Sequence, residues 1–103
     1  MSLSLGYLTT GTAKEAKSLA LGLLEQGLVA CVNVLPQGHS YFVWDEEIVE
    51  EKEFTLILKT RTQNEGNIIK YVKKHHSYDT PCIVFFTIEN GSKDFLEWIE
   101  NNS

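Results

Sequence analysis

The stretch Leu28-Val29-Ala30-Cys31-Val32-Asn33-Val34-Leu35 decides the fold. It is almost continuously apolar, which is typical of a strand buried on both faces. A second run, Cys82-Ile83-Val84-Phe85-Phe86-Thr87-Ile88, has the same character near the other end of the chain. These two runs predict a sheet in which both faces need cover.

Outward from these runs, three more segments have the pattern of strands. Leu3–Thr10 is one of them, and residues 40–44 continue the first run after a kink at Pro36. Residues 54–59 alternate apolar and other side chains, as a strand requires. The acidic stretch 45–53 between them is predicted to be a solvated hairpin tip, because it lacks the spacing of a calcium loop.

Three segments have the pattern of helices, and each begins at a capping residue. Thr12 stands three residues before Glu15, and Thr62 stands three residues before Glu65. Both pairs fit a capping box, in which a hydroxyl and a carboxylate satisfy free amides at a helix start. Ser92 is predicted to cap a short last helix.

The resulting order is strand, helix, strand, strand, helix, strand and a final helix. This order predicts an α/β (α+β) ferredoxin-like fold over a single domain, residues 1–103, with the helices on one face of a four-stranded antiparallel sheet. The other face of such a sheet normally meets water and is polar. Here the strands are apolar on both faces, so we expect a homo-oligomer.

Composition excludes some functions. The net charge of −5 argues against nucleic-acid binding, which needs a basic face. We expect no membrane partner, because no window approaches the length of a membrane span. The chain start lacks the features of a signal peptide, and the two cysteines lie far apart, so we expect a cytoplasmic location.

The side chains that could hold a soft or borderline metal ion are Cys31, Cys82, His39, His75 and His76. None of them has the spacing of a preformed zinc site. The cysteines can equally be small buried hydrophobes, and His75 and His76 can simply complement the dipole at a helix end. Both interpretations stay open.

Two polar residues interrupt the apolar pattern of the strands. Asn33 lies in the middle of one strand and Lys59 near the end of another. Each can be a satisfied buried group, or both can face a cleft between subunits. Periodicity does not distinguish these alternatives.

Several motifs follow one another along the chain. They are Ala30-Cys31-Val32-Asn33-Val34-Leu35-Pro36; Trp44, Ile48 and Glu53; Ile57-Leu58-Lys59-Thr60; His76-x-Tyr78 before Thr80-Pro81; and Asp94-Phe95-Leu96-x-Trp98. In this order they resemble the CutA, or divalent-cation tolerance, family over nearly the whole chain. Two positions depart from the family pattern: Ser77 replaces a usual proline, and Val43 replaces a basic or aromatic residue.

The resemblance implies a ferredoxin-like fold, a trimer built through the sheets, a cytoplasmic location and a role in tolerance of divalent metals, copper especially. It also implies an architecture similar to that of PII signalling proteins, which hold ligands in clefts between subunits. The trimer agrees with the strands that are apolar on both faces.

Two hypotheses for function follow. In the first, a trimer binds copper or another divalent metal ion through Cys31 and one or more of His39, His75 and His76. The alternative is a PII-like small-molecule sensor. Its ligand cleft would be formed by Asn33, Trp44, Glu53, Lys59, His76 and Tyr78. We do not expect an enzyme, since no nucleophile elbow or Gly-rich phosphate loop is present.

Overall fold

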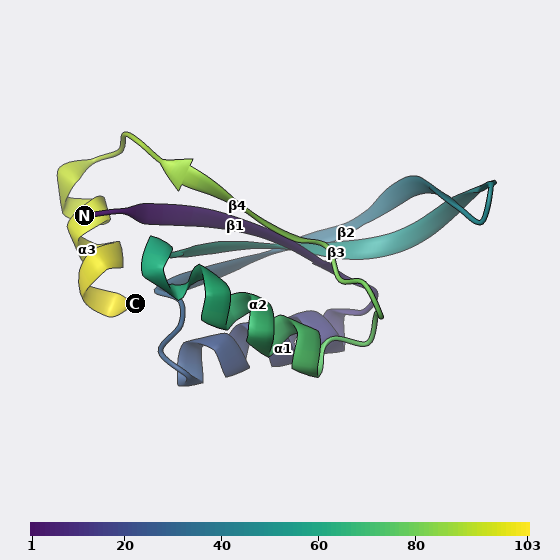
Figure 1. Ribbon diagram of the computed structural model, residues 1–103, viewed down its shortest axis with the longest axis horizontal. Helices are drawn as coiled ribbons and strands as arrows, with labels where there is room; N and C mark the ends of the chain where they lie inside the picture. The colour runs from purple at the N-terminus through teal and green to yellow at the C-terminus, as the bar shows by residue number, and fades with distance from the viewer.

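The computed structural model describes residues 1–103 and has the predicted order of elements (Figure 1). They are β1 (Leu3–Thr10), α1 (Ala13–Glu25), β2 (Cys31–Trp44), β3 (Glu47–Arg61), a single 3-10 turn (Thr62–Asn64), α2 (Glu65–His75), β4 (Ile83–Ile88) and α3 (Lys93–Asn102). The strands form one antiparallel sheet in the order β2-β3-β1-β4. The prediction of a ferredoxin-like α/β fold is confirmed. None of the helices has both the length and the apolar character needed to cross a membrane.

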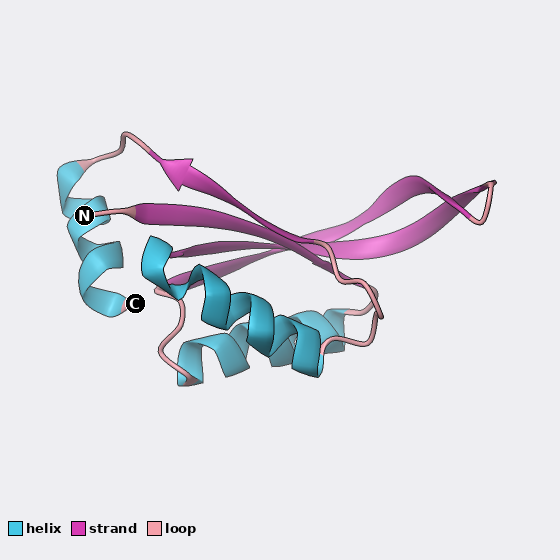
Figure 2. Ribbon diagram, viewed as in Figure 1, coloured by secondary structure: helices cyan, strands magenta, loops and turns pink.

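Both long helices cover the same face of the sheet (Figure 2). Leu8 of β1 and Leu56 and Leu58 of β3 point to this face and are fully buried. Leu19 and Leu23 of α1 pack against them. We call this the helix face, and the opposite face the open face.

The third helix lies at the end of the sheet away from the hairpin (Figure 1). It packs against β1 and β3, and its Ile99 is fully buried. The Phe95 ring lies with its centre 5.8 Å from Nζ of Lys59, a side chain of the open face. Consequently α3 covers only one end of the open face.

The β2–β3 hairpin extends well beyond the helices (Figure 1). Its turn consists of Asp45 and Glu46, both with positive φ, at 49° and 67°. The prediction that residues 45–53 form a solvated tip is wrong beyond these two residues. Residues 47–53 pair with β2, because their backbone groups complete a ladder that leaves every acidic side chain except that of Glu53 exposed. The predicted kink at Pro36 is an irregularity in the β2–β3 register between Leu35 and Gly38.

The first capping prediction is half confirmed. Oγ1 of Thr12 accepts a hydrogen bond of 3.1 Å from the Glu15 amide, as expected. The Glu15 carboxylate does not return to Thr12. It accepts from the amide and the hydroxyl of Ser77, at 2.7 and 3.1 Å, and so anchors the loop after α2 to α1.

The second capping prediction is wrong. No side chain caps α2. The hydroxyls of Thr62 and Ser4 are hydrogen-bonded, and Ser4 also donates to the Glu65 carboxylate. Buried Ser4 needs these partners, so a tertiary contact replaces the local one. The Ser92 cap is confirmed, since its hydroxyl accepts from the Phe95 amide at 3.3 Å.

Candidate functional site

The open face is apolar and partly exposed. Strand alternation puts Tyr7 of β1 and Val84 and Phe86 of β4 on it. Their exposed fractions are 37%, 47% and 59%. No helix of the chain covers them, so this face retains the apolar surface that the strand pattern predicts.

A small polar cluster, Cys31, Asn33 and Lys59, also lies on this face. The Lys59 ammonium donates to Oδ1 of Asn33 and lies 3.6 Å from Sγ of Cys31. The Cys31 thiol lies 3.9 Å from the same Asn33 oxygen. The two polar residues that interrupt the strand pattern are therefore partners of each other, beside a thiol.

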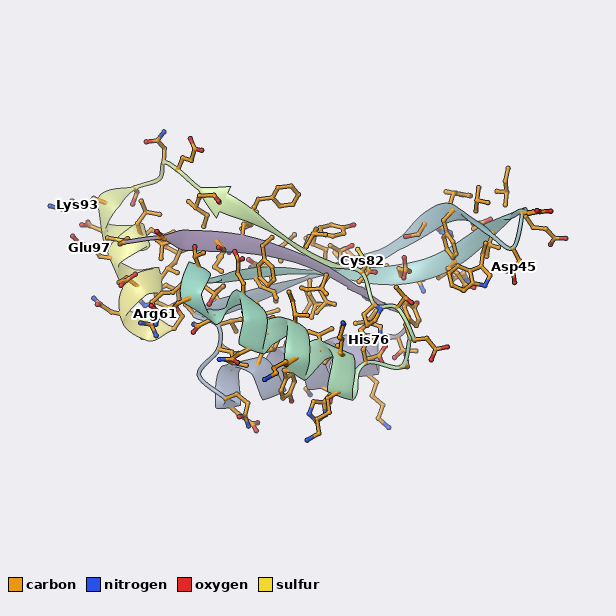
Figure 3. The ribbon with its side chains drawn as sticks, viewed as in Figure 1. Asp45, Arg61, His76, Cys82, Lys93 and Glu97 are labelled. Atoms are coloured by element: carbon orange, nitrogen blue, oxygen red, sulfur yellow. The ribbon has the colours of Figure 1, made fainter.

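A second feature, which we call the hairpin cleft, lies where the hairpin leaves the body of the sheet. Its volume is about 590 Å³. The hairpin contributes Phe42, Trp44, Val49, Glu51 and Glu53. The loop after α2 contributes Ser77, Tyr78, Asp79, Thr80 and Cys82, and Thr9 of β1 completes the lining. Figure 3 shows Cys82 and His76 near this junction and Asp45 at the far end of the hairpin.

The Tyr78 hydroxyl donates a hydrogen bond of 3.0 Å to Oε2 of Glu53, which joins two walls of the cleft. Burial, and then this bond and the nearby Glu53 charge, raise the pKa of Tyr78 to about 12. Burial and the Glu53 charge also raise the pKa of the Cys82 thiol. Both groups therefore stay protonated near neutral pH.

Behind the cleft, His76 is buried and fixes the position of Tyr78. Its Nε2–H donates to the Thr9 carbonyl at 2.7 Å, and its Nδ1 accepts from the Tyr78 amide at 3.0 Å. The two rings are in contact, with centres 4.7 Å apart. These bonds define the neutral tautomer and use both ring nitrogens.

The six residues predicted for a small-molecule cleft fall into two groups within one chain. Trp44, Glu53 and Tyr78 line the hairpin cleft, and His76 supports it from behind. Asn33 and Lys59 lie with Cys31 elsewhere on the open face, outside the cleft lining.

The four predicted metal ligands lie in three separate places: Cys31 on the open face, His39 on the hairpin, and the adjacent His75 and His76 at the end of α2. His39 pairs with Glu50 on the hairpin, with 2.8 Å between Nδ1 and Oε2. His75 ends α2 and packs on Tyr71, with ring centres 4.2 Å apart. No group of three or more His, Cys, Asp and Glu side chains in the chain could hold a metal ion. A site that uses Cys31 would therefore need ligands from more than one copy.

Sequence reasoning missed most of the cleft lining, including Phe42, Glu51, Asp79 and Cys82. A usable signal was present in the acidic stretch. Strand alternation through residues 47–53 puts Val49, Glu51 and Glu53 on one side of the hairpin. Interpreting this stretch as a tip concealed that pattern.

Comparisons with known proteins agree on one family. A family model described as CutA1 divalent ion tolerance protein matches residues 4–102. The divalent-cation tolerance protein CutA of Archaeoglobus fulgidus is 44% identical over 94 residues, which cover 91% of each chain. A CutA homologue of Xenopus laevis is 37% identical over 98 residues. These residues cover 95% of this chain and 65% of that protein.

Solved structures give the same result. The chain is similar to the CutA1 structure from Oryza sativa, with a TM-score of 0.98 and 30% identity over all of this chain and 94% of that one. It is also similar to the structure named as the periplasmic divalent cation tolerance protein CutA from Archaeoglobus fulgidus. That match has a TM-score of 0.94 and 40% identity over 97% of both chains.

Proposed function

This chain belongs to the CutA1 divalent ion tolerance protein family, and from that premise we propose that it works as a homotrimer that binds copper or a related metal ion. The family assignment supports a role in metal tolerance. The number of subunits, the choice of copper and the residues that bind it are our proposal.

The uncovered apolar face carries the proposal of assembly. Fully burying a side chain such as Phe86 contributes about 1.5–3 kcal/mol. Several such side chains together amount to a large share of the stability of a small domain, which is about 5–15 kcal/mol. The hairpin adds more apolar surface outside the cleft, including Val43, 69% exposed, and Ile48, 82% exposed. Contact with other copies would remove this surface from water.

The position of Cys31 supports a copper site within that assembly. Its thiol lies on the open face, where copies of the chain would meet, and thiolate is a preferred ligand of Cu(I). A symmetric assembly would bring three copies of Cys31 to its interfaces and supply the ligands that one chain lacks.

Competition with a chromophoric Cu(I) chelator tests this proposal. We expect Cys31→Ser to lower Cu(I) affinity at least about tenfold, because a soft ligand is lost. Cys82→Ser is the matched control and should leave affinity unchanged. Equal affinity of wild type and Cys31→Ser would remove Cys31 from the site.

One observation favours the second candidate function, a PII-like small-molecule sensor. The hairpin cleft has a volume typical of ligand sites and contains Trp44, Glu53 and Tyr78 from the predicted set. Either function is non-catalytic, in keeping with a family named for tolerance rather than for a reaction.

We further propose a cytoplasmic location, because Cys31 and Cys82 are both unpaired, as is usual in a reducing compartment. Cell fractionation tests this. Recovery in the periplasm, the compartment named for the Archaeoglobus fulgidus structure, would contradict it.

A further inference from the structure

We propose that the hairpin cleft binds an organic cation, with an ammonium group carried on an apolar body. This inference rests on the small-molecule function described above and specifies its ligand class. It does not depend on copper binding at Cys31, which lies outside the cleft lining.

The charge of the cleft has one sign. Glu51, Glu53 and Asp79 line it, and no lysine, arginine or histidine does. The raised pKa values of Tyr78 and Cys82 agree with this, since the Glu53 charge contributes to both. A nucleotide or another phosphate ester would meet three carboxylates and no cation, so the cleft disfavours anions.

The walls of the cleft suit a cation that keeps an apolar surface. Phe42 and Trp44 of the hairpin and Tyr78 of the loop each contribute an aromatic ring. Ammonium groups, quaternary ones above all, are attracted to the faces of such rings. Aromatic rings beside carboxylates are the combination that recognises these ligands.

A bare metal ion fits the cleft less well. The structure contains no group of three or more side chains arranged as metal ligands, although three carboxylates line this cleft. Oε2 of Glu53 is already bonded to the Tyr78 hydroxyl. An alkylammonium ion needs no inner shell of oxygen ligands, only negative potential and apolar contact.

Isothermal titration calorimetry on the full chain, with chelator present to remove metals, tests the inference. The probes are benzyltrimethylammonium, phenylacetate and benzyl alcohol, which share an aromatic ring and differ in charge. We expect the cation to bind at least about tenfold more tightly than either of the others, because both the carboxylates and the rings favour it.

Two variants with the same change of charge locate the site. Glu53→Gln should weaken binding of the cation about three- to tenfold. Glu50→Gln is the matched control: Glu50 lies on the other side of the same strand, paired with His39, and its loss should change affinity less than about twofold. Circular dichroism and sedimentation confirm that both variants keep the native fold and assembly.

The outcomes distinguish a failure of the cationic ligand class from a failure of the small-molecule function. Preferred binding of phenylacetate or benzyl alcohol would overturn the cationic ligand class and leave a small-molecule function standing. Equal weakening in both variants would also overturn it, because it would indicate a general attraction to an acidic protein. Binding of none of the probes would overturn the inference and count against the small-molecule function as well.

Discussion

The hydroxyl of Tyr78 and the carboxylate of Glu53, 25 residues apart in sequence, form a hydrogen bond of 3.0 Å. This bond ties the loop after α2 to β3 at the base of the long hairpin. It therefore links the helix layer, through His76 and Tyr78, to the base of the hairpin that extends beyond the helices.

Tyr78 makes the stability of the folded chain pH-dependent in the alkaline range. Its pKa is raised from 10.0 to about 12 in the folded chain, so the folded state holds this proton more tightly than the unfolded state. The contribution is complete below pH 10 and is lost as pH rises toward 12. Urea unfolding from pH 9 to about 12 should show a steeper loss of stability for wild type than for Tyr78→Phe. Identical pH profiles would contradict the assigned bond.

His76→Phe should destabilise the chain by about 1–3 kcal/mol, because the Tyr78 amide loses its acceptor in a partly buried site. The Tyr78 pKa should also fall toward its ordinary value as the loop loosens. Ultraviolet titration of the phenols measures this shift. A stable variant with the Tyr78 pKa still near 12 would show that His76 does not position the loop.

Much of the fold could be predicted from the sequence. The strand Leu3–Thr10 has the same bounds in the structure, because β-branched and apolar residues ended by Gly11 leave little ambiguity. The capping serine of α3 was also predictable, since it acts within one turn of its own helix. Features decided by near neighbours are the ones that sequence reasoning recovered.

Features decided at long range were missed. The carboxylate of Glu15 bonds to Ser77 rather than to Thr12, and that of Glu65 bonds to Ser4, across sequence separations that no local pattern reports. The hairpin cleft is missed for the same reason. Glu51 and Glu53 come from the hairpin, while Asp79 and the phenol of Tyr78 come from a loop that only the folded sheet brings beside them.

The two helices of the helix face approach closely at Gly22. A methyl group added there would lie 1.9 Å from the Tyr71 hydroxyl oxygen. Gly→Ala inside a helix normally stabilises by about 1 kcal/mol, but Gly22→Ala should destabilise by about 1–3 kcal/mol through overpacking. Chemical denaturation measures whether the free energy of unfolding falls or rises. Adding Tyr71→Phe should recover part of the loss, and a stabilised single variant would contradict the close contact.

The open face can be tested by placing a charge on it. Phe86→Asp should lower the mass of the assembled particle in solution, because a carboxylate in an apolar interface is costly to desolvate. Thr87→Asp is the control, on the same strand but on the opposite face, and should keep the wild-type mass. Equal effects of the two substitutions would argue against an interface on the open face.

Sedimentation equilibrium of the wild-type chain at micromolar concentration tests the central claim most directly. Assembly through the uncovered sheet face predicts a particle of three times the 11.7 kDa chain mass. A stable particle of 11.7 kDa, with the apolar face left in water, would contradict the proposed trimer and the copper site that depends on it.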